Sequence, residues 1–127
     1  MTMATPENTY ECSFPATLEG MRAGMAFLDK ICENPRLDVI FDEIASNIVR
    51  CSSAKDFSVK VVMDGGITLV ISDGGTPFDP TTIAEPDVNA PLEERKVGGL
   101  GFFMVKKMSK SVEYRREGDR NVLTIVM

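Results

Sequence analysis

The stretch Ile67-Thr-Leu-Val-Ile-Ser-Asp-Gly-Gly-Thr-Pro-Phe-Asp-Pro80 begins as an apolar strand and breaks at a glycine pair. If Ile67, Leu69 and Ile71 share the inward face of a sheet, the two-residue period of a strand places Asp73 on that face too. A carboxylate on an apolar face is costly unless a donor reaches it. The glycines that follow allow another surface to approach closely. The stretch therefore suits a ligand amine, such as the exocyclic amine of adenine.

The same residues have a second interpretation. Asp-Gly is commonly a turn in which the aspartate caps its own loop, with no ligand involved. The stretch alone favours neither interpretation, so the rest of the chain has to distinguish them.

Composition limits the classes of protein to consider. The chain has 127 residues, with 43% apolar and 26% charged, and we expect a single domain over residues 1–127. Its net charge of −5 argues against nucleic acid or an anionic membrane as direct partners. Neither an apolar run of membrane-span length nor a signal peptide is visible, which favours the cytoplasm. The sequence contains no histidine, so Ser-His-Asp and Cys-His catalysis are excluded.

Hydrophobic periodicity predicts the order of the elements. We expect a strand over 9–14, helices over 18–32 and 37–54, a hairpin of strands 59–63 and 67–73, a long loop over 76–97, a helix over 100–109, and a hairpin of strands 112–116 and 122–127. This order predicts an α+β fold, a two-layer α/β sandwich with a mixed, mostly antiparallel sheet and about three helices on one face. The opposite face of the sheet is expected to be partly polar.

The first predicted helix carries an apolar stripe that we expect to be buried. Its members recur at spacings of three and four and are Leu18, Met21, Met25, Leu28 and Cys32. The three cysteines of the chain have no metal-ligand spacing, and we interpret them as reduced thiols in or near the core.

Glu43 and Asn47 are a second candidate group. Four residues apart on the second helix, they lie on one line that flanks the apolar stripe through Ile44 and Ile48. A carboxylate and an amide oxygen at this spacing can share a hard cation, and the carboxylate can accept a proton. A solvated helix face is the alternative for such a pair taken alone.

The third candidate is Val97-Gly-Gly-Leu-Gly-Phe102, which runs straight into the third helix. Glycines at this position leave backbone amides bare where they point away from a helix start, which favours phosphate. Arg95 and Lys96 add positive charge just before it. A glycine-rich hinge without a ligand is the alternative.

Taken together and in this order, the three groups resemble the motifs of the Bergerat-fold (GHKL) ATPase superfamily, which includes gyrase, histidine kinases and MutL. The residues 43–47 resemble its asparagine box, residues 73–80 its first glycine box and residues 98–101 its second. The Pro-Phe-Asp-Pro ending of the first box and the segment from Gly98 onward are similar to the small anti-sigma factor serine kinases of bacteria. The resemblance covers the chain from about Phe14 onward.

The resemblance implies a role for each matching position. Asp73 would accept a hydrogen bond from the adenine amine, Gly75 would allow the base to come close, and Phe78 would belong to the same nucleotide site. Asn47 would ligate the magnesium that bridges the phosphates of ATP. Glu43 would be the catalytic general base.

The phosphates of ATP would meet the second glycine box. The residues implied in this contact are Gly98, Gly99, Leu100 and Gly101, with Lys96 before them. Residues 81–97 would be the ATP lid. Kinase members often place an arginine near this box, whereas Val97 occupies the nearest position here. The charge of Lys96 is a compact ammonium group, which binds a phosphate with less defined geometry than the bidentate guanidinium of an arginine.

In the kinases of this kind, the acceptor is a serine of a STAS-type anti-anti-sigma protein, and the unphosphorylated antagonist frees a sigma factor. Members commonly form a homodimer through the sheet. The lack of histidine excludes autophosphorylation on histidine. The alternative function is a nucleotide-dependent protein-interaction module of the same fold, without catalysis.

Overall fold

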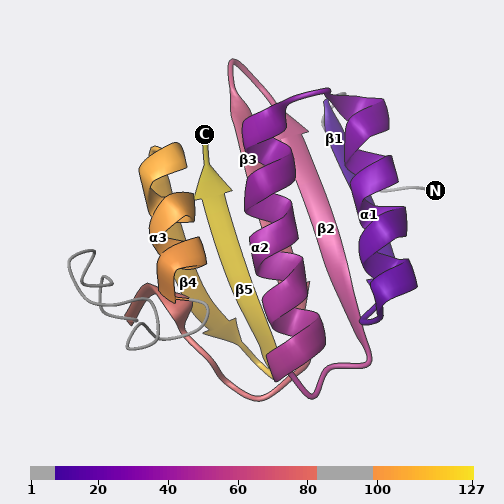
Figure 1. Ribbon diagram of the computed structural model, residues 1–127, viewed down its shortest axis with the longest axis vertical. Coiled ribbons are helices and arrows are strands. Elements are labelled where there is room, and N and C mark those ends of the chain that lie inside the picture. Colours follow the sequence, from indigo (N-terminus) through magenta and orange to yellow (C-terminus); the bar gives the residue numbers. More distant parts are fainter. Residues whose placement is uncertain (1–7, 83–98) are drawn as a thin grey trace.

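The computed structural model describes residues 8–82 and 99–127. In this part of the chain, five strands form one sheet and the three α-helices lie over a single face of it (Figure 1). The elements in chain order are β1 (Thr9–Pro15), α1 (Leu18–Ile31), α2 (Pro35–Cys51), β2 (Asp56–Met63), β3 (Ile67–Asp73), the short 3-10 helix η1 (Pro80–Thr82), α3 (Gly99–Met108), β4 (Ser111–Glu117) and β5 (Arg120–Val126). The predicted α+β sandwich is confirmed.

The strand order is β1-β2-β3-β5-β4, and all four pairings between these strands are antiparallel. The described sheet is thus antiparallel throughout rather than mixed. Two tight turns close its hairpins, and each contains a glycine at positive φ, Gly65 at 69° and Gly118 at 59°. The pairing of β3 with β5 sets Asp73 opposite Asn121. This register brings the last strand of the chain to the end of the strand that carries Asp73.

Local capping explains where the first two helices begin. Thr17 Oγ1 accepts from the Gly20 amide at 3.0 Å, and Asn34 Oδ1 accepts from the Arg36 amide at 2.9 Å. Pro35 occupies the first position of α2, where its missing N–H costs nothing. Asn34 and Pro35 therefore start α2, two residues before the predicted start. None of the described helices is long and apolar enough to cross a bilayer.

The core lies between α2 and the middle of the sheet. Fully buried side chains meet there from both layers, among them Leu37, Ile40 and Phe41 of α2 and Phe57, Val59, Val61, Leu69 and Ile125 of the strands. Figure 1 shows α2 crossing the centre of the sheet, with α1 over the β1 edge and α3 over the β4 edge. This central position fixes α2, and with it the Glu43–Asn47 line.

The predicted stripe of α1 is only partly correct. Leu28 is fully buried, but Leu18 is 55% exposed. The buried line of α1 runs instead through Gly20, Gly24 and Leu28, whose two small residues let the helix approach its neighbours. Because α1 covers an edge of the sheet, it buries a narrower face than the apolar pattern suggested. The expectation of core cysteines is also wrong for Cys12 and Cys51, which are exposed, whereas Cys32 is half-buried.

Candidate functional site

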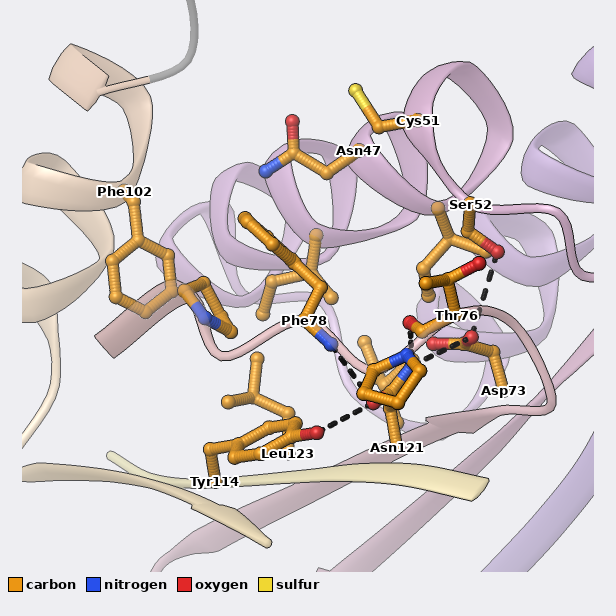
Figure 2. Close-up of a pocket in the computed structure, with 15 residues that line it drawn as sticks. Asn47, Cys51, Ser52, Asp73, Thr76, Phe78, Phe102, Tyr114, Asn121 and Leu123 are labelled. Atoms are coloured by element: carbon orange, nitrogen blue, oxygen red, sulfur yellow. Dashed lines mark hydrogen bonds between the residues drawn. The ribbon is translucent and has the colours of Figure 1, made fainter. Parts of the chain in front are cut away.

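A cavity of about 220 Å³ lies between α2, the loop after β3, α3 and the β4–β5 hairpin. Its apolar wall consists of Ile44, Ile48, Ile71, Phe102 and Leu123. Figure 2 shows Asn47 and Cys51 projecting from α2 on one side, with Asp73 and Asn121 lying on the other. Phe78, which also lines the cavity, is 52% exposed. The cavity thus joins residues from the predicted asparagine box, the first glycine box and the last hairpin.

Asp73 is the buried acid of this cavity, with 6% of its surface exposed. Leu69 and Ile71 are buried on the same face of β3, so the predicted inward position of Asp73 is confirmed. Its Oδ1 accepts from the Gly75 amide at 2.8 Å, and from Asn121 Nδ2 at 3.2 Å. Within the described residues every hydrogen bond to this carboxylate reaches Oδ1, including a longer one from a serine of α2's C-cap. None of the described residues donates to Oδ2.

Gly75 is required by the packing of the loop after β3. A Cβ placed on Gly75 would overlap Ser52 Oγ and lie 2.9 Å from Asp73 Oδ1. Close approach therefore occurs here, as predicted for a glycine at this position. The partners that approach within the protein are the end of α2 and the aspartate itself, and the nearness of a nucleobase stays a prediction.

Asn121 is the second buried polar residue of the cavity, with 7% exposed surface. Its Nδ2 donates to Asp73 Oδ1 at 3.2 Å and to the Thr76 carbonyl at 2.9 Å. Its Oδ1 accepts from the Phe78 amide at 3.2 Å. One side chain of β5 therefore holds both the acid and the loop that follows it.

Two side chains of β4 complete this network. Tyr114 Oη donates to Asn121 Oδ1 at 2.6 Å, and Arg116 Nη1 reaches the same oxygen at 3.2 Å and the Gly75 carbonyl at 2.9 Å. The sequence alone did not point to Tyr114, Arg116 or Asn121. For Asn121, the two-residue period of a strand could have done so: Asn121 lies two residues before the buried Leu123, so it falls on the same inward face of β5.

Glu43 and Asn47 lie one turn apart on α2, as predicted, and Asn47 lines the cavity. Asn47 Nδ2 donates to Glu43 Oε2 at 3.0 Å. Burial raises the pKa of the Glu43 carboxyl, while the hydrogen bond from Asn47 and the charge of Arg50 act in the opposite direction. A half-buried carboxylate in this setting is suited to accept a proton.

The oxygen of Asn47 faces a positive charge. Arg50 Nη2 donates to Asn47 Oδ1 at 3.1 Å. The described residues contain no group of three or more His, Cys, Asp or Glu side chains that could hold a metal ion. The donor set therefore fits a magnesium ion only if the protein supplies one amide oxygen and the remaining ligands come from water and phosphate, which is common for this ion.

The second glycine box lies at the start of α3. Gly99, Leu100 and Gly101 are the first residues of this helix, and Phe102, which follows them, lines the cavity with 2% exposed surface. The helix start is thus adjacent to the cavity, as the phosphate prediction requires. The expected contacts of Lys96 and Gly98 and nearly all of the expected lid lie outside the described residues.

The sequence matches a model of a known protein family. The model of the family described as histidine kinase-like ATPase domain matches residues 14–127. The matched range begins at Phe14 in β1 and continues to the last residue, so it contains every side chain of the cavity. A comparison with curated proteins finds no significant match.

Proposed function

Because this chain belongs to the histidine kinase-like ATPase domain family, we propose that it binds ATP and transfers the terminal phosphoryl group to a serine of a STAS-type anti-anti-sigma protein. Membership of the family confirms the resemblance to the Bergerat-fold superfamily. The observation that carries the proposal is the Asp73 carboxylate. It is buried at the edge of a cavity, its protein donors gather on one oxygen, and the other oxygen is left for a ligand.

The base of ATP fits the apolar half of this cavity. An exocyclic amine can donate to Asp73 Oδ2, while the ring lies among the aliphatic side chains of α2 and β3. A base that presents a carbonyl at this position would set two acceptors against each other and leave Asp73 unpaired, which is costly in a buried site. Phe78, half exposed at the cavity, can cover the base. The site therefore favours adenine.

The phosphates then extend from the base toward Asn47 and the start of α3. Backbone amides at Gly99 and Gly101 are free of intrahelical partners in the first turn and suit phosphate oxygens. Asn47 would hold the magnesium ion through Oδ1. When bound, magnesium neutralises charge on the phosphates and so favours transfer.

Glu43 accepts the proton of the attacking serine hydroxyl. The serine hydroxyl oxygen forms a bond to the γ-phosphorus as the bond from that phosphorus to the bridging oxygen breaks, and ADP leaves. The proton of the hydroxyl passes to the Glu43 carboxylate. Burial, by raising the pKa of this carboxyl, makes it a better acceptor, and Asn47 holds Oε2 in a fixed direction.

The protein would act as a switch on transcription in the cytoplasm. It would sequester a sigma factor until the unphosphorylated antagonist displaces that factor, and phosphorylation of the antagonist would return the kinase to sigma. A homodimer formed through the sheet would be the acting species. These partners are carried over from the anti-sigma kinases that the glycine boxes and the C-terminal segment resemble.

Transfer of label from γ-labelled ATP to a purified STAS protein encoded by a neighbouring gene tests the proposal. We expect label on a serine of the STAS protein with the wild type and a loss of about 100-fold or more with Glu43→Gln, the range seen when a general base is removed. Glu19→Gln, which changes an exposed acid of α1, is the matched control and should retain full transfer. Absence of transfer by the wild type, or equal transfer by Glu43→Gln, contradicts the kinase assignment.

A second function has one observation in its favour. Arg50 donates to Asn47 Oδ1 and Asn47 donates to Glu43, so α2 itself places a cation beside the amide oxygen. Such a domain could bind ATP and use it only to change its contacts with a partner. This function predicts partner binding that needs ATP, survives Glu43→Gln and is lost with Asp73→Asn.

A further inference from the structure

We propose that Asn121 is a positioning residue that fixes the Asp73 carboxylate with Oδ1 toward the protein and Oδ2 toward the ligand. The inference rests on the proposed binding of ATP at this cavity, and it assigns the selection of a base amine to a pair of residues rather than to Asp73 alone. Figure 2 shows Asn121 lying beside Asp73 and Thr76, with dashed lines to its partners.

The orientation of the Asn121 amide is determined by its surroundings. Three donors converge on its Oδ1: the Phe78 amide, the Tyr114 hydroxyl and the Arg116 guanidinium. Two acceptors face its Nδ2, namely Asp73 Oδ1 and the Thr76 carbonyl. Turning the amide over would set donor against donor at Phe78 and Arg116, and acceptor against acceptor at Asp73 and Thr76. The Tyr114 hydroxyl, which can donate or accept, does not distinguish the two orientations. These four contacts direct Nδ2 toward Asp73.

This fixed donor decides which oxygen of Asp73 the protein uses. Nδ2 of Asn121 and the Gly75 amide approach the same carboxylate oxygen, at 3.2 and 2.8 Å. Asp73 and Asn121 are both more than nine-tenths buried, so water competes little for these contacts. With one oxygen held by protein donors, the other oxygen is left to accept a hydrogen bond from the base amine of the ligand.

The network also joins the last hairpin to the loop that carries the predicted adenine contacts. Arg116 bridges Asn121 Oδ1 and the Gly75 carbonyl, and Asn121 itself bridges Thr76 and Phe78 across the loop. The loop from Gly75 to Phe78 is therefore tied to β4 and β5 by side chains and not by strand pairing. Loss of the Asn121 amide would release the acid and the loop together.

An exchange of the amide for a carboxyl group separates positioning from packing. Asn121→Asp keeps the shape and the oxygen that accepts from Tyr114, Arg116 and Phe78, but it replaces the donor facing Asp73 with an acceptor. The titratable and charged described groups that face this position are Asp73 of β3 and Tyr114 and Arg116 of β4. Two carboxylates in contact repel, whereas a proton held between them restores a donor to Asp73 Oδ1.

The test is ATP affinity as a function of pH, measured by titration calorimetry with magnesium present and expressed relative to the wild type at each pH. We expect Asn121→Asp to bind about 10- to 100-fold more weakly than the wild type at pH 8, the cost of losing a hydrogen bond to a charged group. Toward pH 5.5 a large part of this loss should be recovered. Asn121→Leu, which carries no proton to share, should stay weak at every pH. Glu113→Gln, exposed on the opposite face of β4, should match the wild type throughout.

The ATP affinity of Tyr114→Phe is a second test, one that leaves Asn121 itself unchanged. It removes the 2.6 Å hydrogen bond to Asn121 Oδ1 and should weaken ATP binding about threefold to tenfold. Equal affinity of Asn121→Asp and wild type at all pH values, recovery of Asn121→Leu in parallel, or an unchanged Tyr114→Phe each overturns the positioning role. If the wild type itself fails to bind ATP, the proposed function falls instead.

Discussion

Arg50 donates from Nη2 to Oδ1 of Asn47 across 3.1 Å, so the amide oxygen expected to ligate magnesium already faces a cation. The same amide donates from Nδ2 to Glu43, which fixes its orientation. A magnesium ion at Asn47 would have to displace this guanidinium, and the exposed arginine could then turn toward the phosphates of ATP. Arg50 would thus both compete with the metal for Asn47 and supply a positive charge in its place.

Arg50→Met should make ATP binding depend more strongly on magnesium. Without the guanidinium of Arg50, magnesium should bind Asn47 more readily. Without the positive charge of Arg50, ATP should bind more weakly when magnesium is absent. We expect the ratio of ATP affinities with magnesium and with a chelator to rise about threefold to tenfold, the value of one charged hydrogen bond. Titration calorimetry under both conditions measures this ratio. Arg36→Met, exposed in the first turn of α2, is the control, and an equal ratio in the two variants would refute the role of Arg50.

Gly75→Ala should loosen the loop after β3 and weaken ATP binding together. The added methyl group would overlap Ser52 Oγ and crowd Asp73, and overpacking of this kind costs about 1–3 kcal/mol. Gly74→Ala is a matched control because its nearest neighbour, Arg120 Nη1, lies 3.7 Å from the added carbon. Thermal unfolding and ATP titration should show a loss only for Gly75→Ala, relieved in part by adding Ser52→Ala. Identical behaviour of the two single alanine variants would contradict this explanation.

Asp38→Asn should raise the melting temperature at neutral pH. Among the described residues, none forms a hydrogen bond with the buried Oδ1 of Asp38. Burial, together with the contact and charge of Asp29, raises the pKa of the Asp38 carboxyl. A raised pKa means that the folded state holds this proton more tightly than the unfolded state, so the free energy of unfolding falls as pH rises from about 3.8 through the folded value. Replacement by the neutral amide removes this loss.

We expect an increase of about 1–3 °C at pH 7, small because solvent screens part of the repulsion. The increase should shrink toward zero near pH 3, where the acid is protonated in both states. Asp42→Asn, exposed one turn later on α2, serves as the control and should change little at either pH. A melting temperature for Asp38→Asn that is unchanged or lower at pH 7 would be at odds with the assigned cause.

Local patterns in the sequence were sufficient for the elements that depend on neighbouring residues. The alternation of Leu69 and Ile71 placed Asp73 on the inward face, and the spacing of Glu43 and Asn47 placed them on one line of a helix. Both relationships require only the geometry of a strand or a helix. The same reasoning failed for Leu18, because an apolar stripe does not reveal how much of a helix at the edge of a sheet is covered.

Asn121 shows why the rest of the site was not predicted. Its contact with Asp73 depends on the register between β3 and β5, two strands separated by nearly fifty residues of chain. No local pattern around Asn121 in the sequence indicates that register. Arg116 is a similar case, because its inward direction follows from the pairing of β4 with β5 and the residue otherwise resembles any charged residue of a hairpin.

Titration of ATP and of GTP into the full chain, with wild type and Asp73→Asn compared by calorimetry, tests whether this cavity is an adenine-nucleotide site. The asparagine variant keeps the size of the side chain but can present an amide nitrogen to the base amine. We predict that the wild type binds ATP, that GTP binds about 100-fold more weakly, and that Asp73→Asn loses a similar factor for ATP, as expected when a buried polar contact is left unpaired. Equal ATP affinity in the wild type and Asp73→Asn, or no ATP binding by a folded wild type, would contradict the account.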